Sequence, residues 1–331
     1  MTRATWPLTR RAALGGLAAA LAGTARAAPP IRLGALQFGS LRWLVATMQR
    51  HGLDAKYGFA AALRPLANNA AGDIALLGEA VDVIVADWLF AAGRRAAGTP
   101  LCFAPLSGAL GGIMVPSGSP IGALADLRGK RLGVAGGPED KSWLLVRAAG
   151  RRMTGRDTAE AARPIYAAPP LLAAKLRQGE LDAALIYWPY AARLRAEGYR
   201  EAIAVADCAA ALGLPRRLPL VGFVFREGWA EANRQRLDGL LAAAAEASRV
   251  LAADPAEWTA LRPLLDARSD AEVAALRDAF AAGILSDPPD RARDLIARMM
   301  AVLRETGGPR AVAGLASLPP GLIWKPSDAR G

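Results

Sequence analysis

The sequence predicts an α/β fold in which helices flank two parallel-rich sheets, arranged as two lobes. Short apolar strands alternate with helical segments along most of the chain, which is the pattern of βα units. Two extended apolar segments, 101–115 and 220–225, interrupt this pattern and are expected to cross between the lobes. A chain of 331 residues that is 53% hydrophobic is long enough to form two such lobes.

The first lobe is expected to begin with three strands and the helices that follow them. Apolar runs predict strands over 31–36, 61–66 and 81–86. Helices are expected over 41–50, 74–80 and 88–97. Ser40 and Asp87 stand just before two of these helices, where their side chains can accept hydrogen bonds from free backbone N–H groups.

The second lobe is expected to repeat the alternation, and the chain then becomes helical. Strands are predicted over 132–135, 164–167, 181–187 and 202–206, and helices over 141–153, 169–178 and 189–197. Further helices are expected over 229–244, from Pro255, after Ser269 and over 290–304. The first lobe is therefore assigned to 28–115 with 220–331, and the second lobe to 116–219.

The first 27 residues predict an export signal. Arg10 and Arg11 form a twin-arginine pair, and the apolar run 12–22 that follows is too short to span a bilayer. Ala25-Arg26-Ala27 fits a cleavage site of the Ala-x-Ala type. We expect a periplasmic protein, exported by the twin-arginine route.

Charge and composition exclude several classes of function. The formal charge of +11 falls to +7 when the four arginines of residues 1–27 are removed. The remaining basic residues are scattered, so nucleic-acid binding is not expected. His51 is the single histidine, which argues against histidine-based catalysis and metal binding. Cys102 and Cys208 are predicted to lie in different lobes as buried free thiols.

Two motifs in the second lobe carry a family resemblance. Asp126–Val134 reads Asp-Leu-Arg-Gly-Lys-Arg-Leu-Gly-Val, with Gly129 in the turn before a strand. Gly179–Pro189 reads Gly-Glu-Leu-Asp-Ala-Ala-Leu-Ile-Tyr-Trp-Pro, and its Asp182 can hold loop amides at the start of the strand. Both motifs resemble those of the periplasmic solute-binding proteins of ABC importers, in the nitrate/sulfonate/taurine (SsuA/THI5-like) group.

The resemblance implies a type II periplasmic-binding-protein clamshell with two hinge crossings. It further implies that the protein captures a small organic solute between its lobes, is no enzyme, needs no cofactor, and delivers the solute to the permease of an ABC importer in the inner membrane. We expect a monomer.

Four tryptophans follow predicted strands closely, at positions where the sheets of α/β proteins bind ligands. They are Trp43, Trp88, Trp143 and Trp188. If the lobes close, these rings are expected to surround one ligand. The nearby carboxylates Asp87, Glu139 and Asp140 favour a cation or a hydrogen-bond donor over a bare oxyanion.

The loops after the strands supply further ligand candidates. The glycines Gly136 and Gly137 precede a helix whose free amides attract an anion or an acceptor oxygen, to which Lys141 and Ser142 can add. Tyr187 lies at the carboxyl end of its predicted strand. From the resemblance, contacts with the solute are also expected at Gln37, Gly39, Ser40, Ser107 and Gly108.

Two other functions remain open at this point. The resemblance extends to enzymes that make the thiamine pyrimidine with histidine, lysine and pyridoxal phosphate, although His51 stands alone here. Asp87, Glu139 and Asp140 could instead bind a metal or a metal chelate through carboxylate oxygens.

Overall fold

The computed structural model describes residues 28–37, 39–285 and 287–327. The chain from Ile31 onward forms one compact unit. The export signal predicted on residues 1–27 lies outside the described residues.

The first sheet has five strands in the order β2-β1-β3-β10-β4. Their bounds are β1 Ile31–Leu36, β2 Ala61–Leu66, β3 Val83–Asp87, β4 Leu101–Ser107 and β10 Val221–Arg226. β1 pairs in parallel with both β2 and β3, whereas β10 runs antiparallel between β3 and β4. The segment 220–225, predicted to be a crossing between lobes, is therefore largely a strand of this sheet.

The second sheet also has five strands, in the order β7-β6-β8-β5-β9. Their bounds are β5 Gly112–Val115, β6 Arg131–Ala135, β7 Arg163–Ala167, β8 Ala183–Ile186 and β9 Arg200–Ala204. β6 is parallel to its two neighbours, and β5 is antiparallel to β8 and β9. The chain changes sheets between Ser107 and Gly112, so residues 112–115, assigned above to the first lobe, pair in the second sheet.

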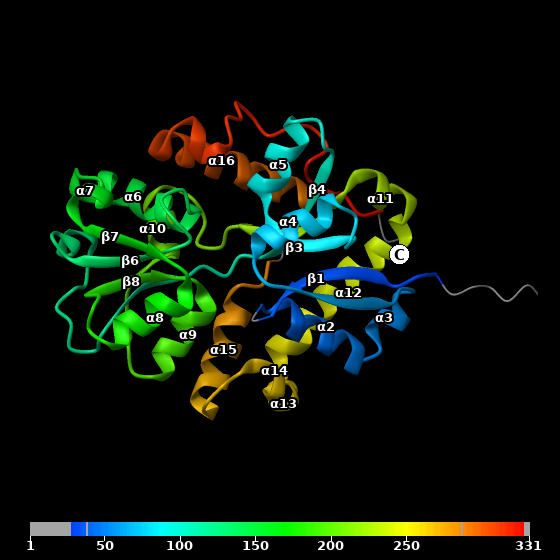
Figure 1. Cartoon of the computed structure of the whole chain (residues 1–331), viewed down its shortest axis with the longest axis horizontal. Coiled ribbons are helices and arrows are strands. Elements are labelled where there is room, and N and C mark those ends of the chain that lie inside the picture. Colours follow the sequence, from blue (N-terminus) through cyan, green and yellow to red (C-terminus); the bar gives the residue numbers. More distant parts are fainter. Residues whose placement is uncertain (1–27, 38, 286, 328–331) are drawn as a thin grey trace, which may run out of the picture. The chain divides into compact units, whose positions relative to one another are not determined.

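Helices cover both faces of each sheet, as alternating βα units require (Figure 1). Up to the end of β7 and just beyond it they are α2 Leu41–Arg50, α3 Leu53–Lys56, α4 Asn69–Leu77, α5 Trp88–Ala96, α6 Lys141–Thr154, α7 Thr158–Ala161 and α8 Pro169–Arg177. Beyond β8 they are α9 Trp188–Ala196, α10 Val205–Ala211, α11 Glu227–Ala232, α12 Arg234–Ala253, α13 Pro255–Ala260, α14 Arg262–Leu265, α15 Asp270–Ala282 and α16 Pro289–Gly307. Helix α16 packs against α6 and contacts β4, so it bridges the two sheets.

Side-chain caps determine where several helices begin. Asp87 accepts hydrogen bonds from two backbone N–H groups of α5, and Asp140 accepts one from α6. Ser40 precedes α2 but forms no capping hydrogen bond, so the predicted cap is wrong. Its backbone is already helical, with φ −65° and ψ −16°, whereas a capping residue takes an extended conformation.

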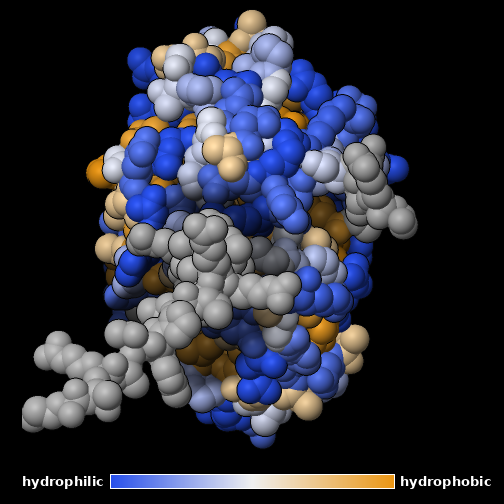
Figure 2. Space-filling view, turned by 90° about the vertical axis from the view of Figure 1, so that its right-hand side faces the viewer, coloured by the Kyte–Doolittle hydropathy of each residue, from blue (hydrophilic) through white to orange (hydrophobic). Residues whose placement is uncertain are grey.

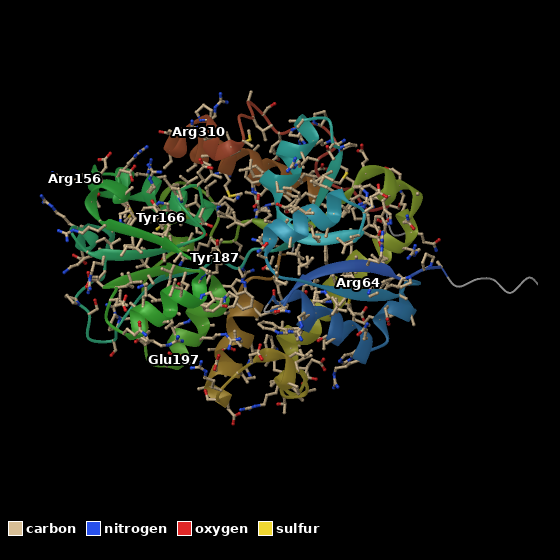
Figure 3. The ribbon with its side chains drawn as sticks, in the orientation of Figure 1. Arg64, Arg156, Tyr166, Tyr187, Glu197 and Arg310 are labelled. Carbon is tan, nitrogen blue, oxygen red and sulfur yellow. The ribbon has the colours of Figure 1, made fainter. Side chains whose placement is uncertain are left out.

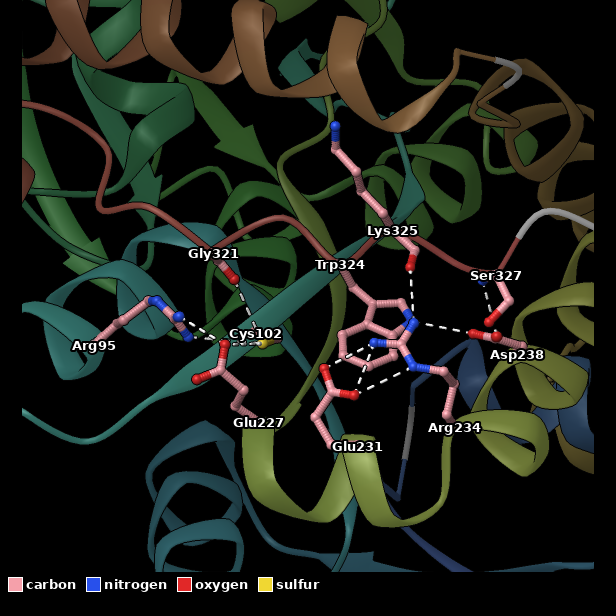
Figure 4. A network of polar contacts seen from close by, with 10 residues as sticks. All are labelled: Arg95, Cys102, Glu227, Glu231, Arg234, Asp238, Gly321, Trp324, Lys325 and Ser327. Carbon is pink, nitrogen blue, oxygen red and sulfur yellow. Dashed lines mark hydrogen bonds and ion pairs between the residues drawn. The ribbon is translucent and has the colours of Figure 1, made fainter.

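The C-terminal segment closes the outer edge of the first sheet. The N–H of Phe103 in β4 donates to the carbonyl of Leu322 at 2.7 Å, and the N–H of Trp324 donates to the carbonyl of Phe103 at 2.9 Å. The Trp324 indole donates to Asp238 at 3.1 Å and lies 4.3 Å under the guanidinium of Arg234 (Figure 4). These contacts satisfy an edge strand that would otherwise expose unpaired backbone groups.

One face of the molecule is mostly hydrophilic (Figure 2). Figure 2 shows one face on which hydrophilic side chains dominate and hydrophobic ones form separate small groups. Among the residues that the structure describes, no helix is both long and apolar enough to cross a membrane.

Candidate functional site

The carboxyl ends of three strands bring together a small group of charged side chains, which we call the Asp87–Lys141 site. Lys141 Nζ at the start of α6 lies 3.1 Å from Oδ2 of Asp87, the last residue of β3 in the other sheet. The Tyr187 hydroxyl, after β8, donates to Asp140 Oδ2 at 3.0 Å. Strand ends of both sheets therefore meet at this site, as expected where α/β proteins bind ligands.

Asp87 uses both of its carboxylate oxygens. Oδ1 accepts from the N–H groups of Leu89 and Phe90 at 2.9 and 3.0 Å, so it caps α5. Oδ2 faces Lys141. The ion pair is partly buried, with the Lys141 side chain 17% exposed and the Asp87 side chain 33% exposed, which strengthens it relative to a fully solvated pair.

The pair of Asp140 and Tyr187 depends on a glycine. Gly136 has φ +90°, and a Cβ there would lie 2.5 Å from the Tyr187 hydroxyl and 2.9 Å from Asp140 Oδ2. Burial raises the pKa of Asp140, opposed by hydrogen bonds from the Trp143 N–H and from Tyr187. Burial and the neighbouring carboxylates of Asp140 and Asp87 raise the pKa of Tyr187, so this hydroxyl stays protonated and acts as a donor. Tyr187 directly follows β8, and Tyr166 lies in β7, the edge strand of the same sheet (Figure 3).

Asp73, in α4, is a member of the site that sequence reasoning missed. Burial and the nearby Asp87 carboxylate raise the pKa of Asp73 from its ordinary 3.8 to about 6, against the opposing charge of Arg94. A mid-helix aspartate fourteen positions before Asp87 has no sequence signal for this role, because only the packing of α4 on β3 places it there.

Replacing Asp73 by asparagine is expected to stabilise the protein near pH 7 and to have little effect near pH 4. The folded state holds the Asp73 proton more tightly than the unfolded state, so the wild-type protein loses stability as the pH rises from about 4 to about 6. Asparagine does not ionise and removes this loss. Thermal unfolding at both pH values tests the prediction, with the exposed Asp294→Asn as the control. Equal stability of Asp73→Asn and wild type at pH 7 would contradict it.

Trp88 and Trp143 flank the site but are wholly buried. Both side chains are 0% exposed and belong to one core cluster with residues of α16. Their indole Nε1 atoms have no hydrogen-bond partner. Trp88 is the first residue of α5 and Trp143 the third residue of α6, next to the two residues of the ion pair.

Trp43 and Trp188 lie in a separate aromatic group. Their ring centroids are 6.1 Å apart with the rings nearly perpendicular, and Trp258 and Phe280 complete the cluster. The Trp43 indole donates to the carbonyl of Leu264 at 3.1 Å. The structure therefore divides the four predicted tryptophans between two core clusters and does not gather them around one ligand. The direction in which a ring points depends on its position in the first helical turn after the strand. Closeness to a strand end therefore does not determine which face of the sheet the ring covers.

The residues of the loops after β1 and β4, which were also predicted to contact the ligand, lie in two other places. Gln37 lines a pocket of about 390 Å³ at the carboxyl ends of β1 and β2, together with Arg42 and Asp266. Its backbone carbonyl accepts a hydrogen bond from the Arg42 guanidinium. Gly39 and Ser40 form the turn that leads from this pocket into α2.

Ser107 and Gly108 are engaged in backbone structure. The Gly108 N–H donates to the carbonyl of Gly283 at 2.8 Å, and the Ser107 hydroxyl accepts from the Ala109 N–H at 3.2 Å. Gly108 lines a second pocket, of about 660 Å³, between α9 and α15.

Gly137 is buried and Ser142 is 8% exposed, both on the loop and first turn that carry Asp140.

The carboxylates of the Asp87–Lys141 site do not form a group that could bind a metal ion. Within the described ranges, no three or more histidine, cysteine, aspartate or glutamate side chains come together in a way that could hold a metal ion. Glu139, one of the three carboxylates considered above, is exposed to solvent.

A family model described as NMT1/THI5 like matches residues 74–258. This range runs from within α4 to within α13, includes β3 to β10 but not β1 and β2, and contains Asp87, Lys141 and Tyr187. No curated protein matches the chain.

Several solved structures share the fold. The periplasmic aliphatic sulphonate binding protein SsuA from Escherichia coli has a TM-score of 0.72 and 20% identity, over 92% of this chain and 95% of that one. The alkanesulfonate-binding protein SsuA from Xanthomonas axonopodis pv. citri, bound to MOPS, has a TM-score of 0.69 and 18% identity, over 90% and 99%. The periplasmic nitrate-binding protein NrtA from Synechocystis PCC 6803 has a TM-score of 0.53 and 18% identity, over 75% and 69%. These likenesses confirm the type II periplasmic-binding-protein fold.

Proposed function

We propose that this chain, which belongs to the NMT1/THI5-like family, captures a small organic solute and delivers it to an ABC importer. The observation that carries the proposal is the ion pair of Asp87 and Lys141, 3.1 Å apart. It joins the carboxyl ends of strands in two different sheets, and a solute bound there would contact both. The structures of similar fold include sulfonate- and nitrate-binding proteins, which supports a binding role.

The two lobes of the proposed clamshell follow the two sheets. We assign the first lobe to the sheet of β1, β2, β3, β4 and β10, and the second lobe to the sheet of β5 to β9. The connections over 108–111 and 212–220 then serve as the hinges. Solute binding would stabilise the closed arrangement, in which Lys141 reaches Asp87. The permease would recognise that arrangement.

Location and assembly follow from the same role. We propose that residues 1–27 direct export by the twin-arginine route and that the protein acts in the periplasm as a monomer. Its partner is the permease of the importer in the inner membrane.

A catalytic role has less support from the site. The thiamine-pyrimidine enzymes depend on histidine, and His51 lies at the end of α2 with its Nε2 3.1 Å from the buried carboxylate of Glu257. Glu257 also receives hydrogen bonds from Thr47 and Arg50, so His51 belongs to a structural network. We therefore propose binding without conversion.

Native mass spectrometry of the gently isolated protein tests this function. We expect one small organic molecule per chain, which leaves on unfolding, rebinds on titration and has an unchanged mass after incubation. Chemical conversion of that molecule by the protein, or the absorbance of bound pyridoxal phosphate, would contradict the proposal.

A further inference from the structure

Arg193 extends from a helix of the second sheet to helices that pack on the first sheet. It lies in α9, which packs on β5 and β9. Its guanidinium donates to the Leu265 carbonyl at 2.6 Å and to the Asp266 carbonyl at 3.2 Å, and it forms an ion pair with the Glu272 carboxylate. Within the part of the chain that the structure describes, these are the hydrogen bonds of this guanidinium, and all of them lead to residues of α14 and α15 or the turn between them.

The acceptors of Arg193 belong to the first lobe as proposed above. Leu265 is the last residue of α14, Asp266 follows it, and Glu272 lies in the first turn of α15. Helix α15 packs against α12, α12 packs against α2, and α2 packs against β1. Helices α9 and α15 lie side by side (Figure 1). Arg193 therefore forms a second connection between the two lobes, in addition to the ion pair of the Asp87–Lys141 site.

The ion pair of Arg193 and Glu272 is largely shielded from solvent. The Arg193 side chain is 20% exposed and the Glu272 side chain 7% exposed. The other carboxylate oxygen of Glu272 accepts from the Arg268 N–H at 2.8 Å. With the lobes together, loss of Arg193 would leave a buried carboxylate without its counter-charge, which is strongly unfavourable. Separation of the lobes would let water reach that carboxylate, so the loss penalises the closed arrangement more than an open one.

The segment that receives Arg193 also borders a pocket. Asp266 ends α14 with φ +51° and ψ +31°, a left-handed conformation that few residues with a Cβ adopt. The side of the segment is one wall of the pocket of about 390 Å³ that Gln37 and Arg42 also line, at the carboxyl ends of β1 and β2. Arg193 therefore holds the turn next to a pocket at the ligand-binding edge of the first sheet.

An aromatic contact reinforces the same boundary. Trp188 begins α9, and its ring lies edge-on to Trp43 of α2 at 6.1 Å and to Phe280 of α15 at 6.4 Å. Ala192, one helical turn later, is buried in the core cluster of the first sheet. Helix α9 thus places a ring, a methyl group and the Arg193 cation against the first lobe.

We infer that Arg193 is a positioning residue for solute binding, which holds the two lobes in the arrangement that binds the solute. Loss of its side chain lowers the fraction of molecules in that arrangement, and the apparent affinity falls in the same proportion. The inference rests on the proposed function, because it requires two lobes that close over a solute.

The distance between two spin labels, one on each lobe, tests this role. Ile74→Cys in α4 and Leu171→Cys in α8 give labelling positions whose native side chains are 73% and 50% exposed. Cys102 and Cys208 are buried and are expected to stay unlabelled. Double electron–electron resonance is measured on the full chain as gently isolated, and again after refolding without added solute. Wild-type protein is expected to show a short distance, and Arg193→Met is expected to lower the ratio of short to long distances by about tenfold.

Two further variants separate this role from a general loss of structure. Glu272→Gln keeps the size of the side chain and an oxygen for the Arg268 N–H, removes the charge, and is expected to shift the distances in the same direction. Arg131→Met is the matched control, because Arg131 also binds a carboxylate and a carbonyl, those of Asp182 and Gly179, but within the second lobe. It is expected to leave the distances unchanged.

The outcomes distinguish this inference from the proposed function. Equal distance distributions of wild type and Arg193→Met in both preparations would overturn the inference, and a molecule bound to both proteins would leave solute binding intact. Loss of the short distance in Arg193→Met but not in Arg131→Met supports the inference. If native mass spectrometry then finds no bound molecule in wild type, the connection between the lobes stands and its role in solute binding is overturned.

Discussion

Replacing Asp87 by asparagine is expected to weaken solute binding by about 10- to 100-fold while α5 stays folded. Asparagine caps a helix as well as aspartate does, so the hydrogen bonds to Leu89 and Phe90 are retained. The charge that attracts Lys141 is lost. Because this ion pair joins the two sheets, its loss lowers the population of the binding-competent arrangement, and the apparent affinity falls with it.

The same loss is expected from Lys141→Met, and the double variant is expected to be no weaker than either single variant. Such non-additivity indicates that the two residues act through each other. Calorimetric titration of all three variants measures it. Lys175→Met, which removes the partner of Glu180 on the surface, is the control and is expected to bind normally. Full additivity of the two single effects would show that Asp87 and Lys141 act independently.

Replacing Trp324 by alanine is expected to lower the free energy of unfolding by about 3–5 kcal/mol. The ring is 5% exposed and packs against Phe225 with a centroid distance of 5.5 Å. Its loss leaves a cavity, removes the hydrogen bond to Asp238 Oδ1 and detaches the segment that covers the edge of β4. The effect is structural, because Trp324 lies far along the chain from Asp87 and Lys141.

Urea unfolding followed by circular dichroism measures this difference. Trp324→Phe keeps most of the buried ring and loses the hydrogen bond to Asp238, so it is expected to lose less than half as much stability. A loss below about 1 kcal/mol for Trp324→Ala would mean that the C-terminal segment contributes little to the first sheet.

Hydrophobic patterning predicts most of the elements but not the direction of every strand. The apolar runs that became β4, β5 and β10 indicate burial on both faces, and burial alone does not distinguish parallel from antiparallel pairing. The apolar pattern of 220–225 therefore predicts a crossing equally well, although this segment lies between β3 and β4.

Only part of the Asp87–Lys141 site could be predicted from the sequence. Some of its residues are placed by local sequence, and others only by tertiary packing. Asp87 is the last residue of β3 and Asp140 stands in the loop after β6, and each caps the next helix, so their positions follow from local sequence. Asp73 lies within a helix, and only tertiary packing brings it near Asp87. The tryptophans show the same limit, because proximity to a strand end does not determine whether a ring enters the core, as Trp88 does.

Small-angle X-ray scattering of the protein, with and without a tightly binding solute, tests the proposed clamshell most directly. We predict a smaller radius of gyration on binding, and a weaker compaction in Lys141→Met at the same solute concentration. An unchanged radius of gyration in wild-type protein saturated with a tight ligand would contradict two lobes that close over a solute.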